Sequence, residues 1–252
     1  MKLFPTLAAL ALSGCAAAPV NAPLPQPAHT YEDAVRDAAI VNADEIAHNL
    51  IAITPSNPKL YWNADKSKIK VVTWKSQASY ERYLKPNTST SPSPANVVWV
   101  STAPEVQQFC QNFTQSHNQL SNADLELRLK QFLGLNPDWQ YDVFVELWVS
   151  PQDLFRPCQD PEINDSSCTL SFSDPVPVVQ NIPDYPSFYK NLYFSDFRSL
   201  PGVPWTGLGY TYDWGNPNSA QGASEFILRP GAAYETVSVT ATADYCHLSP
   251  AK

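Results

Sequence analysis

Two segments in which apolar and polar side chains alternate limit the fold of this chain more than any other feature. Tyr141 to Ser150 reads YDVFVELWVS, and from Tyr234 to Tyr245 valine and alanine alternate with threonine and serine. Successive side chains of a strand point to opposite faces, so this period of two predicts β-strands, the second with one dry and one wet face. The chain must therefore build a sheet and cover at least one of its faces.

Shorter runs of β-branched and aromatic residues predict further strands. These runs are Ile69 to Trp74, Val97 to Ser101, Gly209 to Trp214 and Ser224 to Leu228, with at most short strands around Thr169 to Phe172. Apolar residues at helical spacing predict helices. The helical segments are Thr30 to Thr54, as one helix or two short ones, then Pro104 to Phe113 and Asn122 to Leu133.

The order of these elements predicts the fold class. Helices mixed among strands and then strands in succession favour an α+β domain with a largely antiparallel sheet and two or three helices in its N-terminal half. The proline-rich region from Pro151 to Pro183 is expected to be irregular. The length suits one hydrophobic core, so we expect a single globular domain over residues 30–252.

The first residues predict export. Lys2 supplies one positive charge, and the apolar run from Leu3 to Leu12 has about ten residues, whereas a membrane-spanning helix needs about twenty. Small residues follow the run at Ser13 and Gly14, where a signal peptidase would cut. We therefore interpret residues 1–14 as a signal peptide.

The four residues Leu12, Ser13, Gly14 and Cys15 resemble, position by position, the lipobox of bacterial lipoprotein precursors. The resemblance covers only the targeting segment. It implies that the Cys15 thiol carries diacylglycerol, that the chain is cut before this residue, and that the new amino group is acylated, for example with palmitate. Two or more acyl chains anchor a protein stably, since each buried methylene contributes about 0.8 kcal/mol. The alternative is an ordinary secretory signal cut within residues 16–18, which would leave a free protein.

Residues 15–29 are expected to tether the domain to the membrane. Prolines at positions 19, 23, 25 and 27 favour extended polyproline II structure and disfavour packed elements. Ala16 stands where, in many Gram-negative lipoproteins, an aspartate marks retention in the inner membrane. The resemblance therefore implies the outer membrane, on either its periplasmic or its surface side.

Once Cys15 is assigned to the lipid, four cysteines remain in an oxidising compartment, where disulfides persist. Cys110, Cys158, Cys168 and Cys246 allow three pairings. We favour Cys158 with Cys168 and Cys110 with Cys246, because the first pair brackets a short loop that can close locally. The disulfide between Cys158 and Cys168 would then constrain the irregular region.

No metal site is predicted. A four-cysteine zinc site needs close pairs such as C-x2-C, which the chain lacks. The loop between Cys158 and Cys168 gathers acidic residues as calcium loops do, but Asp165 stands where an EF-hand needs its turn glycine. A solvated acidic loop is the simpler interpretation.

Charge and motifs exclude several function classes. A net charge of −8 argues against nucleic acid or anionic phospholipid as a partner, since both attract clustered Lys and Arg. The chain contains no G-x-S-x-G, no H-E-x-x-H and no P-loop, and its four histidines are scattered. We therefore expect no cofactor, and a non-enzymatic role is favoured.

Glu146 is the first candidate catalytic residue, because strand alternation places it on one face with Phe144 and Trp148. An apolar setting raises the pKa of a carboxyl group, which is how a general acid is made. With Asp213 or Glu225 it could form the carboxylate pair of a glycan hydrolase. The alternative is a structural ion pair of Glu146 with an arginine, such as Arg128 or Arg156.

The second candidate site is the aromatic C-terminal region. Strand geometry places Tyr210, Tyr212 and Trp214 on one face, near Trp205, and the segment Tyr185 to Phe194 adds further rings. Exposed, such a row would stack against sugars or a peptide, whereas buried it would be part of the core. The aromatic density favours some rings facing solvent or a ligand.

These observations favour a lipid-anchored binding or assembly module of the cell envelope, which engages glycan or a partner protein through its aromatic C-terminal region. The first alternative is an envelope glycan hydrolase that uses paired carboxylates and predicts a cleft. The second is a purely structural lipoprotein subunit, which predicts a flat apolar patch.

Overall fold

The computed structural model describes residues 30–117 and 120–247 of the chain. The predicted signal peptide, the predicted lipidation site Cys15 and the predicted tether up to residue 29 lie outside the described residues, as do residues 248–252 of the predicted domain. The described part is an α+β fold with a largely antiparallel sheet, as the sequence predicts. Within it, every helix is too short or too polar to cross a bilayer.

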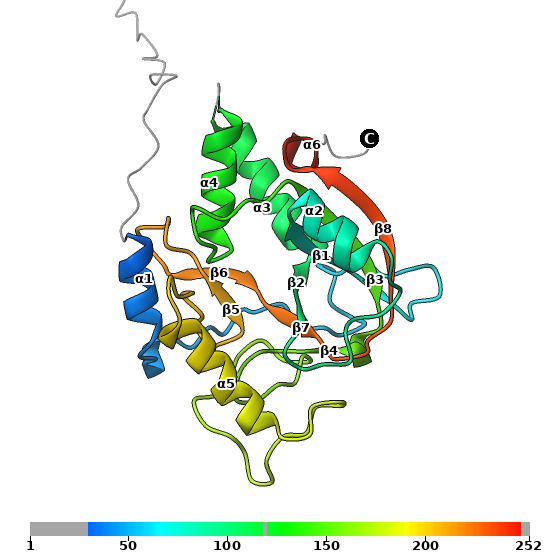
Figure 1. Ribbon diagram of the computed structural model, residues 1–252, viewed down its shortest axis with the longest axis vertical. Coiled ribbons are helices and arrows are strands. Elements are labelled where there is room, and N and C mark those ends of the chain that lie inside the picture. The colour runs from blue at the N-terminus through cyan, green and yellow to red at the C-terminus, as the bar shows by residue number, and fades with distance from the viewer. Residues whose placement is uncertain (1–29, 118–119, 248–252) are drawn as a thin grey trace, which may run out of the picture.

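The main sheet has six strands in the order β4-β7-β2-β1-β3-β8, and each neighbouring pair is antiparallel (Figure 1). Its strands are β1 (Ile69–Lys75), β2 (Val98–Thr102), β3 (Val143–Val149), β4 (Leu154–Phe155), β7 (Phe226–Leu228) and β8 (Tyr234–Ala241). A second, two-stranded sheet pairs β5 (Tyr210–Tyr212) with β6 (Gln221–Ser224).

Helices cover the sheet and its edges. They are α1 (Tyr31–Ala38), α2 (Gln77–Ser79), which continues into the π-helical turn Tyr80–Leu84, α3 (Ala103–Ser116), α4 (Asn122–Phe132), α5 (Tyr185–Arg198) and α6 (Thr242–His247). Thr30 caps α1 by accepting a hydrogen bond from the backbone N–H of Asp33. Ser121 caps α4 in the same way through Asp124.

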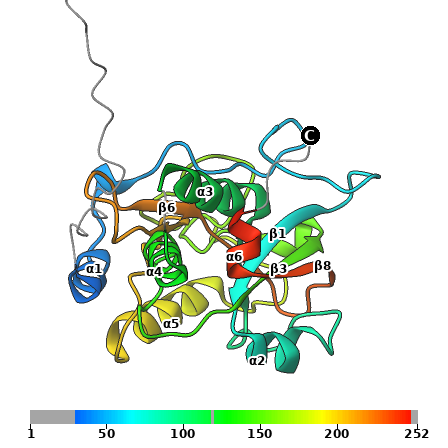
Figure 2. The same cartoon turned by 90° about the horizontal axis from the view of Figure 1, so that it is seen from above.

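The alternation in β3 separates two cores, as its sequence predicts. Val143, Val145, Leu147 and Val149 pack on one face, with Ile69 and Val71 of β1 and the apolar residues of segment 51–60. Phe144 packs on the other face, where α3, α4 and α6 cover β1 and β3 (Figure 2). Helix α5 covers the opposite end of that second face, at β7 and β4.

Two disulfides form with the predicted pairing. Cys110 of α3 is bonded to Cys246 of α6, with 5.1 Å between their Cα atoms. Cys158 is bonded to Cys168, with 6.3 Å between their Cα atoms, in the irregular region after β4. The first disulfide joins two helices that lie far apart in the sequence, and the second closes a local loop.

The predicted helix over Thr30 to Thr54 is only partly correct. It ends at Ala38, a 3-10 turn follows at Ala43–Glu45, and residues 46–54 are not helical. Their backbone instead bonds to the loop that the second disulfide closes, with Leu50 N–H donating to the Ser166 carbonyl oxygen over 3.0 Å. Pairing with a distant segment therefore overrides the local helical spacing.

The last predicted strand is also partly wrong. Strand β8 ends at Ala241, and the next six residues form α6. Val237 and Val239, expected on the dry face, are 39% and 37% exposed. The reason is that the residues of β8 after Tyr234 do not pack in any of the hydrophobic cores of the described residues, and only β3 lies beside this edge strand. The expected short strand around Thr169 to Phe172 does not form.

Candidate functional site

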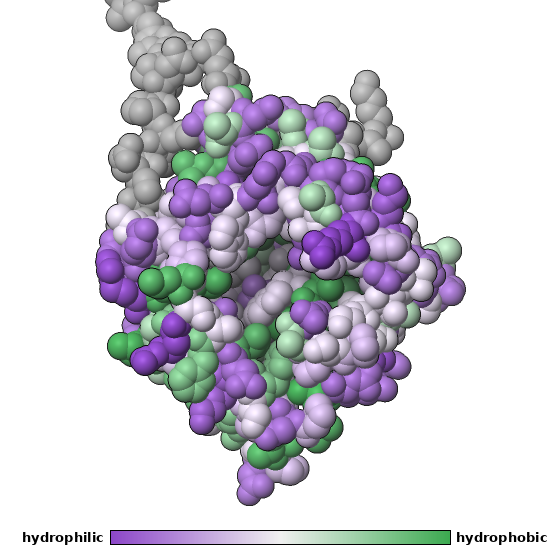
Figure 3. All heavy atoms as spheres, in the orientation of Figure 1, coloured by the Kyte–Doolittle hydropathy of each residue, from purple (hydrophilic) through white to green (hydrophobic). Residues whose placement is uncertain are grey.

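A cavity of about 810 Å³ lies between the second face of the sheet and α5. Figure 3 shows it as a hollow near the centre of the visible face, with apolar side chains around the opening. Exposed residues that line it mark its mouth. They are Pro94, Ala95, Trp139, Pro183, Asp184, Ser187, Asn191 and Ser195.

The cavity exists because the helices cover only the two ends of this sheet face. Strand alternation directs Val98 and Val100 of β2 toward the first face, so Trp99 and Ser101 face the second. Around them, α3 packs against β1 and β3, whereas α5 packs against β7 and β4. The part of the face between these two groups of helices, at Trp74 of β1 and at Trp99 and Ser101 of β2, therefore lines the cavity.

Aromatic rings dominate the walls of this cavity. Trp74 stacks on Tyr141, with 4.8 Å between ring centroids, and on Phe144, with 5.3 Å. Other rings come from β2, the loop after α4, α5 and the segment before β5, namely Trp99, Trp139, Phe188 and Trp205. Stacked rings held by a sheet give rigid flat surfaces suited to planar, apolar or cationic groups.

Two carboxyl groups border the same space. Glu225 lies between β6 and β7, and because Phe226 and Leu228 point to the first face, alternation turns Glu225 to the cavity side. Its backbone N–H donates to the Gly209 carbonyl oxygen over 2.9 Å, which fixes the strand there. Asp196 reaches the cavity from α5.

Burial raises the pKa of both carboxyl groups toward neutrality. The pKa of Glu225 is raised to about 8, mainly by loss of hydration and further by the charge of Asp196. Loss of hydration raises the pKa of Asp196 to about 7, although a weak hydrogen bond from the Ser195 hydroxyl over 3.4 Å lowers it slightly. Near neutral pH the cavity therefore holds carboxyl groups that can keep or release a proton.

Few other charges line the cavity. Of its lining residues, all in the described part of the chain, Lys75 is the one base, and Asp184 at the mouth is the third acid. Burial lowers the pKa of Lys75. Hydrogen bonds from the Ser187 hydroxyl and backbone N–H lower the pKa of Asp184, so this group is ionised.

Of the two alternatives for the row of aromatic side chains, exposed or buried, the structure has the buried one. Trp205, Tyr210, Tyr212 and Trp214 are each at most 5% exposed. The hydroxyl of Tyr210 donates to the Glu45 carbonyl oxygen over 2.8 Å, and that of Tyr212 donates to the Asp37 carboxylate over 2.6 Å. Three of the four, Trp205, Tyr210 and Tyr212, nevertheless line the cavity, and their role in ligand binding stays a prediction.

Two of the predicted catalytic residues lie outside the cavity. Glu146 accepts a hydrogen bond from the Ser238 hydroxyl over 2.9 Å and pairs with Lys70 over 3.5 Å, so its structural partner is neither Arg128 nor Arg156. Asp213 is only 2% exposed and accepts two hydrogen bonds from the Arg128 guanidinium. Of the three predicted carboxylates, Glu225 lines the cavity.

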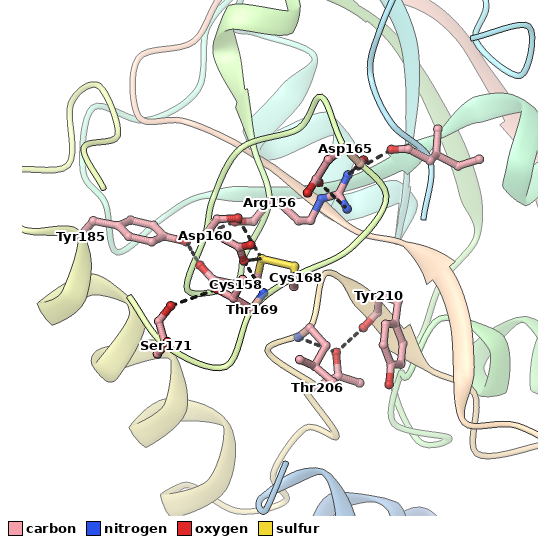
Figure 4. The surroundings of a disulfide bond; sticks show 12 residues. Arg156, Cys158, Asp160, Asp165, Cys168, Thr169, Ser171, Tyr185, Thr206 and Tyr210 are labelled. Atoms are coloured by element: carbon pink, nitrogen blue, oxygen red, sulfur yellow. Dashed lines mark hydrogen bonds and ion pairs between the residues drawn. A yellow bond between two sulfur atoms is a disulfide. The ribbon is translucent and has the colours of Figure 1, made fainter. Parts of the chain in front are cut away.

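The disulfide loop is a structural site built around Arg156 (Figure 4). This guanidinium is fully buried, donates to the carbonyl oxygens of Ile51 and Asp165, and lies 4.0 Å from the Asp165 carboxylate. Carboxylate oxygens of Asp160, Glu162 and Asp165 lie within 4.8 Å of one another, as calcium ligands would. Arg156 already supplies a cation beside this group, which fits a structural role.

Gly209 makes room for this arginine. Its φ of +75° lies in the left-handed region, and a Cβ there would come within 2.5 Å of the Arg156 Cδ atom. The tight turn before β5 therefore depends on glycine at this position.

Several residues of the cavity were not identified from the sequence. Asp196, Trp74, Trp99 and Trp139 come from four different segments, and no local motif joins them. A signal was present for α5, because Asp184 followed by a proline and Ser187 is typical of a helix N-terminus. Recognising that helix would have placed the residues of its cavity-facing side together.

Comparison of the chain with family models, with curated proteins and with solved structures gives no match. The function is therefore argued from the geometry of the cavity itself.

Proposed function

We propose that the protein is a lipid-anchored binding module of the cell envelope, which holds a small-molecule ligand in the aromatic cavity between its sheet and α5. The cavity carries this proposal. A volume of about 810 Å³ falls within the range of about 300 to 1,000 Å³ typical of ligand sites, and its walls are mostly apolar with a few polar groups, as in such sites.

The proposed cellular location of the module is inferred from the N-terminal residues. The lipobox resemblance of Leu12 to Cys15 favours an acylated Cys15 and the outer membrane, and the proline-rich segment would hold the domain off the bilayer. Two disulfides suit an oxidising compartment. The partners that fit are an envelope glycan or an envelope protein that presents or receives the ligand, and the acidic charge argues against nucleic acid.

Tryptophan fluorescence tests the proposal, because Trp74, Trp99, Trp139 and Trp205 all line the cavity. The full mature chain is titrated with peptidoglycan fragments, oligosaccharides and lipid extracts of the envelope. We expect a saturable spectral change with at least one of these. If no fraction changes the emission, the proposal is wrong.

Two matched variants locate the response. Ser195 and Arg198 are both exposed on α5, but only Ser195 lines the cavity. Ser195→Phe places a ring at the mouth and should weaken binding, whereas Arg198→Phe should leave binding unchanged. An equal effect of the two variants would place the ligand elsewhere.

A glycan hydrolase is the second candidate function, and one observation favours it. Glu225 and Asp196 share the cavity, and a pKa near neutrality suits a general acid. Release of reducing sugar ends from peptidoglycan by the wild type, lost in Glu225→Gln, would support the hydrolase. Binding of the same glycan without cleavage would support the binding module.

A further inference from the structure

The carboxyl group of Glu225 lines the cavity without an ion-paired base in the described part of the chain. No ion pair or side-chain hydrogen bond of Glu225 is formed among residues 30–117 and 120–247, whereas Glu146 and Asp213 each have a basic partner. The charged group that acts on Glu225 is Asp196, a second acid. Both acids are only partly exposed, and neither is ion-paired with Lys75, the one base that lines the cavity. The two acids are therefore costly to ionise together, and either protons or a ligand must compensate them.

The rings around the acids favour one kind of compensation. Trp74, Trp99 and Trp205 form walls of the same cavity, and the faces of indole rings attract cations. Cation–π attraction is strongest where water is excluded. Aromatic walls and unpaired carboxylates together suit a positively charged organic group better than a neutral or an anionic one.

We propose that the ligand of this cavity carries an organic cation, an amine or a quaternary ammonium group, which Glu225 and Asp196 hold against the indole rings. This inference rests on the proposed function, since it names the ligand class of the same cavity. An anionic ligand such as a fatty acid would bring a third negative charge to the acidic pair. A neutral sugar would stack on the rings but make no ion pair with the acids, whose charge only protons would then compensate.

Binding of a cation replaces a proton. In the empty cavity near neutral pH, Glu225 keeps the proton that compensates its charge, because its pKa is raised to about 8. When the cation enters, the carboxyl group releases this proton to solvent and pairs with the ligand. Affinity should therefore rise with pH up to about 8 and fall as the pH drops below it.

Other groups around the cavity do not produce this dependence. The pKa of Tyr141 and of Tyr210 is raised to about 12, and that of Tyr212 is raised further, so these phenols stay neutral. Asp184 at the mouth is already ionised, because its pKa is lowered. The remaining groups are Asp196, whose pKa of about 7 adds to the same trend, and Lys75, whose pKa burial lowers. Protonation of Lys75 at lower pH would repel a bound cation, so it also lowers the affinity as the pH falls.

The experiment compares two probes of the same shape. Benzyltrimethylammonium carries the cation, and neopentylbenzene is its uncharged carbon analogue. Both are titrated into the full mature chain, with tryptophan fluorescence and calorimetry as readouts. At about pH 9 the cation should bind about tenfold more tightly than the neutral analogue, and at about pH 6 its affinity should fall by about tenfold or more.

Two variants assign the preference to its residue. Glu225→Gln removes one of the two acids and should weaken both the preference for the cation and its dependence on pH, of which Asp196 keeps a part. Glu146→Gln makes the same change at a carboxylate outside the cavity and should bind as the wild type does. Because Glu225→Gln changes a partly exposed acid that has no ion-pair partner, we expect it to fold, and its thermal unfolding is measured alongside.

The outcomes separate this inference from the proposed function. Equal affinity of the wild type for both probes at about pH 9 overturns the proposal of a cationic ligand and leaves the cavity as an apolar binding site. Loss of the preference in Glu146→Gln, or a preference in Glu225→Gln as large as in the wild type, overturns the assignment to Glu225. No response to either probe overturns the inference, and together with no response to the envelope extracts it overturns the proposed function as well.

Discussion

Arg128 of α4 donates two hydrogen bonds to Asp213, with 2.8 and 2.7 Å between the guanidinium nitrogens and the carboxylate oxygens. The same guanidinium lies over the ring of Phe109, 4.8 Å from its centroid. This pair holds α4 against the turn after β5, so Asp213 stabilises the fold rather than acting on a substrate. Paired carboxylates of this kind differ from Glu225, which has an acid as its neighbour.

Removing one partner of this buried pair should destabilise the protein strongly. Asp213→Asn leaves the Arg128 charge uncompensated, and we expect a loss of about 3 kcal/mol in the free energy of unfolding, measured by urea denaturation. Glu235→Gln removes the partner of Lys68 at the exposed edge of the sheet and should cost less than about 1 kcal/mol. Similar losses in the two variants would contradict the structural role given to Asp213.

The two disulfides should contribute unequally. On the chain-entropy model, the bond between Cys110 and Cys246, 136 residues apart, contributes about 5 kcal/mol, and the bond between Cys158 and Cys168, 10 residues apart, about 3 kcal/mol. Replacing each pair by alanine and measuring the unfolding free energy tests this order. The reverse order would show that the local loop around Arg156 matters more than the closure of the long chain segment.

The stability of the wild type should depend on the proton of Glu225. Its pKa is about 8 in the folded protein and ordinarily 4.5, so between these values the folded state binds more protons than the unfolded state. Protonation of Glu225 therefore stabilises the folded state fully below about pH 4.5, and this stabilisation is lost as the pH rises to about 8. Its size is at most about 1.4 kcal/mol for each unit by which the pKa is raised.

Glu225→Gln isolates that contribution, because the amide does not titrate. The variant should gain in unfolding free energy relative to the wild type as the pH rises from about 5 to about 8. Thermal or urea unfolding at several pH values measures the difference. A constant difference over this range would mean that Glu225 is not protonated in the folded protein.

The lipid anchor is tested at its attachment residue. If Cys15 is acylated, the intact mature chain should start at this residue and carry the mass of its acyl chains, and Cys15→Ser should release the protein from the membrane fraction. Mass spectrometry of the intact chain, with and without reduction, checks the acylation and the disulfides together. A mature chain that starts at Ala17 or Ala18 without acyl mass would support the ordinary secretory signal.

Local sequence patterns predict the parts of the fold that local physics determines. The alternation in Tyr141 to Ser150 predicts both the strand and its two faces, because each side chain there meets a different core. Residues 46–54 show the limit of such reasoning, since their helical spacing is overridden by pairing with the loop closed by Cys158 and Cys168. An edge strand such as β8 likewise loses burial that its alternation predicts.

The cavity could be predicted only in part. Sequence density of aromatic residues indicates a site near Trp205 to Trp214, and Glu225 is identified as a candidate acid. The sequence does not show that Tyr210 and Tyr212 have partners for their hydroxyls on distant segments, and are therefore buried. Nor does it show that Asp196 of α5 shares a cavity with Glu225, since that depends on how helix and sheet pack.

The most direct test of the ligand-binding cavity is native mass spectrometry of the full mature chain purified from its own envelope. The cavity between the sheet and α5 predicts an added small-molecule mass on the wild type and on Arg198→Phe, and its loss from Ser195→Phe, which places a ring at the mouth. A wild type that carries no added mass, even after exposure to an envelope extract, would contradict it.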